Sequence, residues 1–452
     1  MILGIFQHWL QRMSSLQNFY ELEKEHIETT SEEGKRKNHL GFVTDFYFLL
    51  LSNPEDIPQE CDIQKLQERI EKDIEIVHQD IEKDNASILF KFKNEKELRE
   101  KGVELDVKKA ANQYMEFREM PEIHGTNTLI MLITRFEEFI SKVFSVLFGM
   151  FPQKYLDDQK VMFSELADSN LEQIRELIIQ RQVDAKMHES HTEWFKIFTS
   201  HGIDFKHCKD EMNALREIYA RRNIMVHNSG KVNSIYLNTV KEATYDIGET
   251  LYADEAYLSN AFDVIYVLSF TLCIEFAKLI KDQKNKYLEA IFNAAYVKLC
   301  DEKYYLCRKV FNALLHNKYL DGRYRNMSTV NYWLSCIALE GLEPVKKEIE
   351  EFDTSALDPS FELAKYMLLQ QYDEATECLE LLYSKHMVDV KMVETWPLFR
   401  DFKNTEQYKS FRNKHIEEYE VEKFEIPPED LSDEIENGTQ FDSVIPQDCE
   451  TM

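Results

Sequence analysis

The sequence predicts an all-α protein, and three observations lead to that prediction. Glycine and proline are scarce, at 12 and 10 of 452 residues, so few positions interrupt helices. Apolar residues recur at steps of three and four along several long segments, which is the helical period. From about residue 286 the chain has the texture of short paired helices. We therefore expect a helical N-terminal region, a central helical bundle and a C-terminal array of helix pairs.

Composition and charge suggest how the chain is divided. The hydrophobic share of 44% is that of a globular protein, and the length suggests two to four domains. A net charge of −28 argues against general nucleic-acid binding, yet residues 201–245 carry seven Lys and Arg against five Asp and Glu. Residues 416–452 hold thirteen acidic residues and one lysine, which is typical of a disordered tail. The remaining boundaries are expected at 1–120, 121–283 and 284–415.

The N-terminal region, residues 1–120, has no chemical motif and no role that its sequence indicates. Apolar residues from Ile63 to Ile81 recur at steps of three and four and predict a helix there. Residues 88–93 alternate between apolar and polar and predict a short strand.

Three long helices are predicted in the central region. The first covers residues 126–150 and places Glu137 at the edge of its apolar stripe, where a buried acid needs a partner. The second covers residues 210–226, and Gly230 can adopt the left-handed conformation that ends it. The third covers residues 255–282. The stripe of the first helix consists of Leu129, Ile133, Phe136, Ile140, Val143 and Leu147.

In the C-terminal region, similar segments begin at Tyr304, Leu342 and Tyr372, each predicted to start the second helix of a pair. Their spacings of 38 and 30 average the 34-residue period of tetratricopeptide repeats. Such repeats build concave surfaces that hold a peptide, a protein or another signal. An irregular helical domain is the alternative.

The sequence favours a reduced, cytoplasmic protein without a bound cofactor. Its eight cysteines are dispersed with no Cys-x-x-Cys pair, and no histidine and cysteine spacing matches a metal site. Gly-rich nucleotide-binding loops are absent from the sequence. The longest apolar segment, residues 261–280, contains Asp263 and Glu275, so a buried helix is expected rather than a membrane span.

The pair Arg222 and His227 is the main chemical candidate. Arginine binds a phosphate through a planar, permanently charged fork, and histidine exchanges a proton near neutral pH. Together they can cleave RNA through its own 2′-hydroxyl without a metal. An ideal helix places the two about 140° apart. They meet only if the last helical turn unwinds or if a second chain completes the site. A purely structural interpretation pairs Arg222 with Glu137 or Glu217 and leaves His227 as a helix cap.

The stretch from Glu217 to Asn233, followed by Tyr236 and Leu237, closely resembles the signature of HEPN domains, most of all the RiboL-PSP-HEPN type of bacterial toxins and defence proteins. That signature is an arginine, a polar residue and a histidine four to six residues after the arginine. The resemblance extends over about residues 122–283, including residues 136–139 and 193–195.

The resemblance implies a metal-independent endoribonuclease that acts as a homodimer, a toxin or antiphage-defence effector with RNA as its substrate. Arg222 and His227 would be catalytic, and 2′,3′-cyclic phosphate ends would result. Asn223 would orient His227 or substrate, with Arg221 in support and Glu137 as a partner of Arg222. Two alternatives remain: a non-catalytic HEPN and repeat scaffold, or a HEPN subunit regulated by an antitoxin or a nucleotidyltransferase.

Overall fold

The computed structural model describes residues 1–37, 74–82, 85–93, 95–100, 107–157, 160–161 and 170–420. The predicted all-α class is confirmed, because helices dominate and the described part contains a single two-stranded sheet. The chain divides into two compact units, Met1–Ser335 and Cys336–Met452. The predicted boundary at 120/121 falls inside a helix, and the one at 283/284 directly precedes another.

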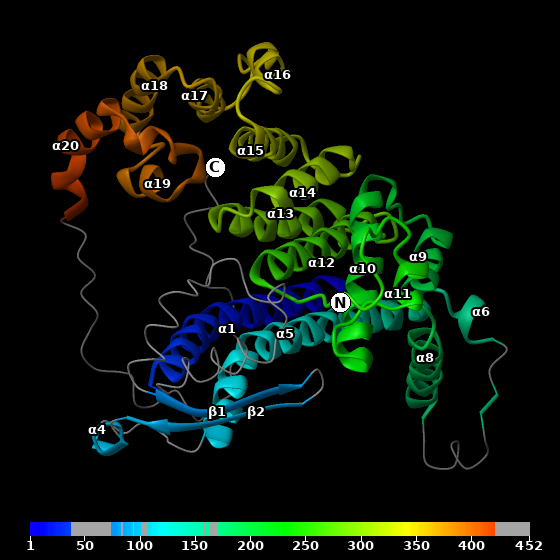
Figure 1. Cartoon of the computed structure of the whole chain (residues 1–452). Helices are drawn as coiled ribbons and strands as arrows, with labels where there is room; N and C mark the ends of the chain where they lie inside the picture. Colours follow the sequence, from blue (N-terminus) through cyan, green and yellow to red (C-terminus); the bar gives the residue numbers. More distant parts are fainter. Residues whose placement is uncertain are drawn as a thin grey trace, which may run out of the picture. The chain divides into compact units, whose positions relative to one another are not determined.

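The first unit is built almost entirely from helices (Figure 1). Its elements are α1 (Ile2–Lys37), β1 (Ile74–Glu82), β2 (Asn85–Phe92), α4 (Glu95–Glu100), α5 (Val107–Met150), α6 (Pro152–Tyr155), α8 (Leu171–Met187), α9 (His191–Ser200), α10 (Lys209–Asn228), α11 (Ser234–Thr239), α12 (Glu255–Phe276), α13 (Lys284–Cys300), α14 (Tyr304–His316) and α15 (Gly322–Glu340), the last of which continues into the second unit.

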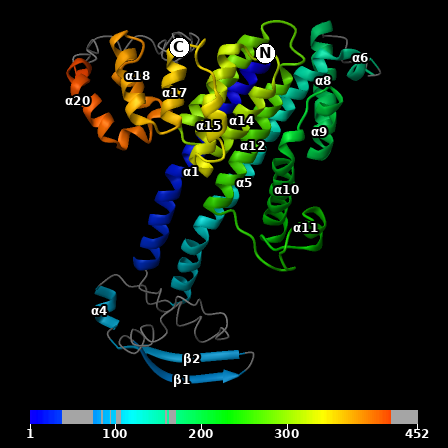
Figure 2. The same ribbon diagram turned by 90° about the horizontal axis from the view of Figure 1, so that it is seen from above.

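Helix α5 is the central helix of this unit. It packs against α1, which runs beside it in both views (Figures 1 and 2), and also against α8, α10 and α12. The six residues of its predicted apolar stripe are all buried, so this prediction is confirmed. The helix passes through Pro121, whose missing N–H leaves the Phe117 carbonyl without its usual partner. The Ser31 hydroxyl of α1 donates to that carbonyl at 2.8 Å and compensates for the loss.

One helix prediction in the N-terminal region was wrong. Residues 74–82 form strand β1, which pairs antiparallel with β2, and residues 63–73 lie outside the described part. The β-branched Ile74, Ile76 and Val77 suit a strand, and pairing with β2 provides hydrogen-bond partners for its backbone. The strand predicted at residues 88–93 is confirmed as β2, which ends at Phe92.

Helix α12 ends at Phe276, six residues before the predicted end. Residues 277–279 donate to carbonyls three residues back, which tightens the chain, and Gln283 is left-handed with φ 55°. By length and composition α12 could span a membrane, but most of its apolar stretch is buried inside the protein. That burial fits the core helix that the sequence predicts.

The second unit contains short helices. These are α16 (Lys346–Glu351), α17 (Pro359–Leu368), α18 (Tyr372–Ser384), α19 (Val390–Thr395) and α20 (Glu406–Glu420). Tyr304 begins α14 and Tyr372 begins α18, each packed on the helix before it, as predicted. The prediction at Leu342 was wrong, because residues 342–345 form a turn before the six-residue α16. Helix α20 extends to Glu420, past the predicted start of the acidic tail, and residues 421–452 lie outside the description.

Candidate functional site

Helix α10 carries the arginine and histidine of the predicted signature. Acidic residues occupy its first turn, where the helix dipole favours them. It remains helical through Asn228, and the backbone N–H groups of Ser229 and Gly230 both donate to the Ile224 carbonyl. Gly230 is left-handed as predicted, with φ 74°, and Ser229 is left-handed as well, with φ 49°. A side chain at Gly230 would place its Cβ atom 2.9 Å from the Leu251 carbonyl oxygen, so this position requires glycine.

Arg222 contacts the partner that the sequence predicts. Its Nη2 atom lies 3.6 Å from Glu137 Oε1 on α5, and its guanidinium lies 5.9 Å from the centre of the Tyr219 ring. Both members of the ion pair are partly exposed, at 27% for Arg222 and 34% for Glu137. The pair is therefore accessible to a ligand while it limits where the arginine can reach.

Asn223 and His227 lie one helical turn apart on another face of α10, where both line a cavity of about 600 Å³. Both side chains are exposed. Glu137 also lines this cavity, whereas Arg222 is not among its lining residues. Because the last turn of α10 does not unwind, Arg222 and His227 stay on different faces within one chain. The sequence left two ways for Arg222 and His227 to meet, unwinding of the last helical turn or a second chain. In this structure the last turn is not unwound.

Arg221, predicted as a support for substrate, is buried and does not line the cavity. Its Nε atom donates to Glu217 at 2.7 Å, its Nη1 atom donates to the Tyr252 carbonyl at 2.9 Å, and its guanidinium lies 4.0 Å from the Tyr257 ring centre. Glu217 also accepts hydrogen bonds from the hydroxyls of Tyr236 and Tyr257, both at 2.7 Å. Burial and Glu217 raise the pKa values of both tyrosines. Arg221 thus fastens the chain that follows α10 onto the helix.

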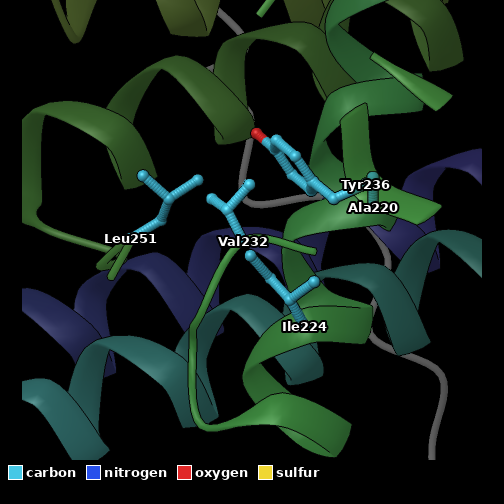
Figure 3. Close-up of a cluster of buried hydrophobic side chains, with 5 residues drawn as sticks. All are labelled: Ala220, Ile224, Val232, Tyr236 and Leu251. Atoms are coloured by element: carbon cyan, nitrogen blue, oxygen red, sulfur yellow. The ribbon is translucent and has the colours of Figure 1, made fainter. Parts of the chain in front are cut away.

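An apolar cluster strengthens the same attachment (Figure 3). Ala220 and Ile224 of α10 pack against Val232, Tyr236 and Leu251 from the segment between α10 and α12. The backbone is paired there as well, since the residue 232 N–H donates to the residue 249 carbonyl at 2.8 Å. This packing holds α11, and the residues that lead into it, beside α10. As a result Asn233, Ile235 and Thr239 line the cavity, together with Asn228 at the end of α10.

We expect Arg221→Ala to lower the free energy of unfolding by roughly 2 kcal/mol. Loss of a buried cation is costly, but the two tyrosine hydroxyls continue to stabilise the Glu217 carboxylate. Arg222→Ala is the matched control, because its partly exposed pair should contribute less than about 1 kcal/mol. Urea unfolding of the two variants measures the difference. Equal midpoints would contradict the structural role given to Arg221.

The cavity also has lining residues that were not predicted as site residues, among them His191, Trp194, Arg216 and Tyr219. The rings of His191 and Tyr219 stack at 4.7 Å, and Trp194 meets Tyr219 edge-on at 6.3 Å. Trp194 is buried, and its Nε1 atom donates to the Lys186 carbonyl at 2.8 Å. Burial, together with the charge of Arg216, lowers the pKa of His191 to about 4, so this imidazole is neutral at pH 7.

No group of three or more His, Cys, Asp or Glu side chains in the described part is arranged to hold a metal ion. His201 bonds the Tyr155 hydroxyl at 2.7 Å, and the Cys208 thiol contacts the Thr271 hydroxyl at 3.4 Å. Burial raises the pKa of Cys208 to about 11, so it is a neutral thiol at pH 7.

Comparison with known proteins gives no match: no family model, no curated protein and no solved structure matches the chain. A function for this protein is therefore inferred from its own residues and their geometry.

Proposed function

We propose that this protein is a metal-independent endoribonuclease of the HEPN type, with Arg222 and His227 as its catalytic residues. The observation that carries the proposal is the position of His227 and Asn223 on the wall of one cavity, one turn apart on α10. Arg222 lies on the neighbouring face, held by Glu137, which lines the same cavity. The packing of α5, α10 and α12 against one another also supports a HEPN-like bundle.

In the proposed reaction the 2′-oxygen of RNA bonds to the adjacent phosphorus, and the bond from that phosphorus to the 5′-oxygen breaks. His227 removes the proton of the 2′-hydroxyl or donates a proton to the leaving 5′-oxygen. Arg222 stabilises the negative charge that develops on the phosphoryl oxygens. Asn223, one turn from His227, orients the imidazole or the substrate.

A homodimer completes this site. One chain presents Arg222 and His227 on different faces, and one histidine cannot readily act as both acid and base in a single step. A two-fold axis near the end of α10 would bring two arginines and two histidines together. Exposed apolar residues near that end favour contact with a second chain, since Val226 is 47% and Ile235 is 73% exposed.

The wider role that we propose is that of a cytoplasmic toxin or antiphage-defence effector. The paired helices of the C-terminal region would hold a protein partner or a signal that controls cleavage.

The alternative is a non-catalytic scaffold, or a HEPN subunit neutralised by an antitoxin or a nucleotidyltransferase. One observation favours it: Arg222 already has an acidic partner, Glu137, which suits a purely structural arginine.

Cleavage of single-stranded RNA in excess EDTA tests the proposal. We expect the wild-type protein to cleave, the double variant Arg222→Ala/His227→Ala to be inactive, and His188→Ala to match the wild type. His188 is an exposed histidine that does not line the cavity, so it is a matched control. Equal activity of the double variant and the wild type would contradict the proposal.

A further inference from the structure

The cavity beside His227 is lined by a buried imidazole that has an unpartnered nitrogen. The Nε2 atom of His191 is buried and forms no hydrogen bond with any described residue. The Tyr219 hydroxyl faces the Glu137 carboxylate, whose charge and side-chain hydrogen bond add to burial in raising the pKa of Tyr219. Buried polar groups without partners are rare in native proteins and costly, so each calls for a ligand or ordered water.

The same cavity has an aromatic wall. His191 stacks on Tyr219, and Trp194 packs against Tyr219 edge-on. Bases of single-stranded nucleic acids stack on aromatic side chains of proteins, and any base can do so because every base has a π-face. The position of this wall is fixed, since Trp194 is anchored to the Lys186 carbonyl and the ring of His191 is stacked in place.

The size of the cavity, and a largely apolar lining that carries a few polar and charged groups, fit a nucleoside better than a peptide side chain. About 600 Å³ falls within the range of small-molecule sites and exceeds what one amino-acid side chain fills. The rim carries both a cation, Arg216, and acceptors, Glu137 and Glu189. A base offers donors and acceptors on one edge, and the phosphate attached to it would suit Arg216.

We infer that this cavity is a base-binding subsite for single-stranded RNA, in which a base stacks against the aromatic wall and bonds His191 Nε2. This inference rests on the proposed function, because it supplies the substrate contact that places a phosphate near His227. His191 is a specificity residue here and Tyr219 supports its ring from behind, and neither takes part in the proton transfers. Because His191 is neutral across pH 6–8, its contribution to binding should not change over that range.

Binding of DNA tetranucleotides, which lack the 2′-hydroxyl and cannot be cleaved, tests this inference separately from catalysis. Four sequences that differ in one base, and an abasic version, would be compared in fluorescence anisotropy. We expect the preferred base to bind about tenfold more tightly than the least favoured of the other three, and all four to bind more tightly than the abasic probe. His191→Phe keeps the stacking but removes the nitrogen. It should erase most of the tenfold preference among bases, while His188→Phe should preserve it.

A free mononucleotide is the other source of the same chemistry, and AMP, GMP, CMP and UMP form a second set of probes. Weak mononucleotide binding beside tighter tetranucleotide binding supports an RNA subsite, whereas equal affinity for both overturns it in favour of a free-nucleotide site. Identical base preferences in His191→Phe and His188→Phe would also overturn the inference. Base-selective binding without RNA cleavage would reject the proposed nuclease and keep the subsite. If the protein cleaves RNA and His191→Phe changes neither the rate nor the cut position, the proposed nuclease stands and the subsite is rejected.

Discussion

His227→Ala should cleave RNA 10²- to 10⁴-fold more slowly than the wild type, which is the usual contribution of a positioned acid or base. If two chains share the site, the variant should also inactivate wild-type chains that pair with it. Co-expression in equal amounts would place about half of the wild-type chains in mixed dimers. Cleavage per wild-type chain should then fall to about half.

The control for this experiment is co-expression of the wild type with His188→Ala, which should give no loss, because His188 is exposed and lies outside the cavity. Arg222→Ala should behave like His227→Ala in both respects. Unchanged cleavage per wild-type chain in the presence of His227→Ala would show that each chain acts alone. That result would contradict the shared site.

Gly125→Ala should lower the free energy of unfolding by about 3 kcal/mol, although alanine is the better helix former. Gly125 is buried on α5, and a Cβ atom built there would lie 2.2 Å from the Ala253 carbonyl oxygen. A Cβ atom and a carbonyl oxygen that are not bonded to each other cannot lie so close together. The segment before α12 would therefore have to move. Arg221 bonds the carbonyl of the residue before Ala253, Tyr252, and the shift would therefore strain the attachment beside α10 as well.

Gly149→Ala is a matched control on the same helix. Its Cβ atom would meet Ile179 Cδ1 at 3.6 Å, an ordinary contact, so stability should be unchanged or slightly higher. Urea unfolding followed by tryptophan fluorescence measures both variants, since Trp9 and Trp194 are buried in this unit. Equal midpoints for Gly125→Ala and the wild type would show that the close approach to Ala253 imposes no constraint.

Local patterns were sufficient to predict the long helices and some of their ends. The apolar stripe of α5, the left-handed Gly230 and the starts of α14 and α18 all depend on residues near one another in sequence. Strand β1 was missed because its isoleucines also fit a helical period, and only pairing with β2 decides between the two. The early end of α12 comes from the hydrogen bonds of residues 277–279 to carbonyls three residues back, for which the sequence gives no signal.

The candidate site divides in the same way. The contact between Arg222 and Glu137 was one of the two pairings that the sequence left open, since an arginine on an apolar helix face needs an acidic partner and Glu217 was the other candidate. The sequence could not predict that Arg221 is buried while Arg222 is partly exposed. Burial of Arg221 depends on Glu217 and on the segment after α10. His191 comes from another helix, and no spacing in the sequence relates it to Tyr219.

The chemistry of the cut ends tests the proposed nuclease most directly. Purified protein would be incubated with a defined RNA in excess EDTA, and the product ends would be identified by mass spectrometry. Attack by the 2′-hydroxyl predicts 2′,3′-cyclic phosphate and 5′-hydroxyl ends, and a single 2′-deoxy nucleotide on the 5′ side of the cut should block cleavage there. Products with 5′-phosphate ends, or cleavage next to the deoxy nucleotide, would contradict a mechanism based on Arg222 and His227.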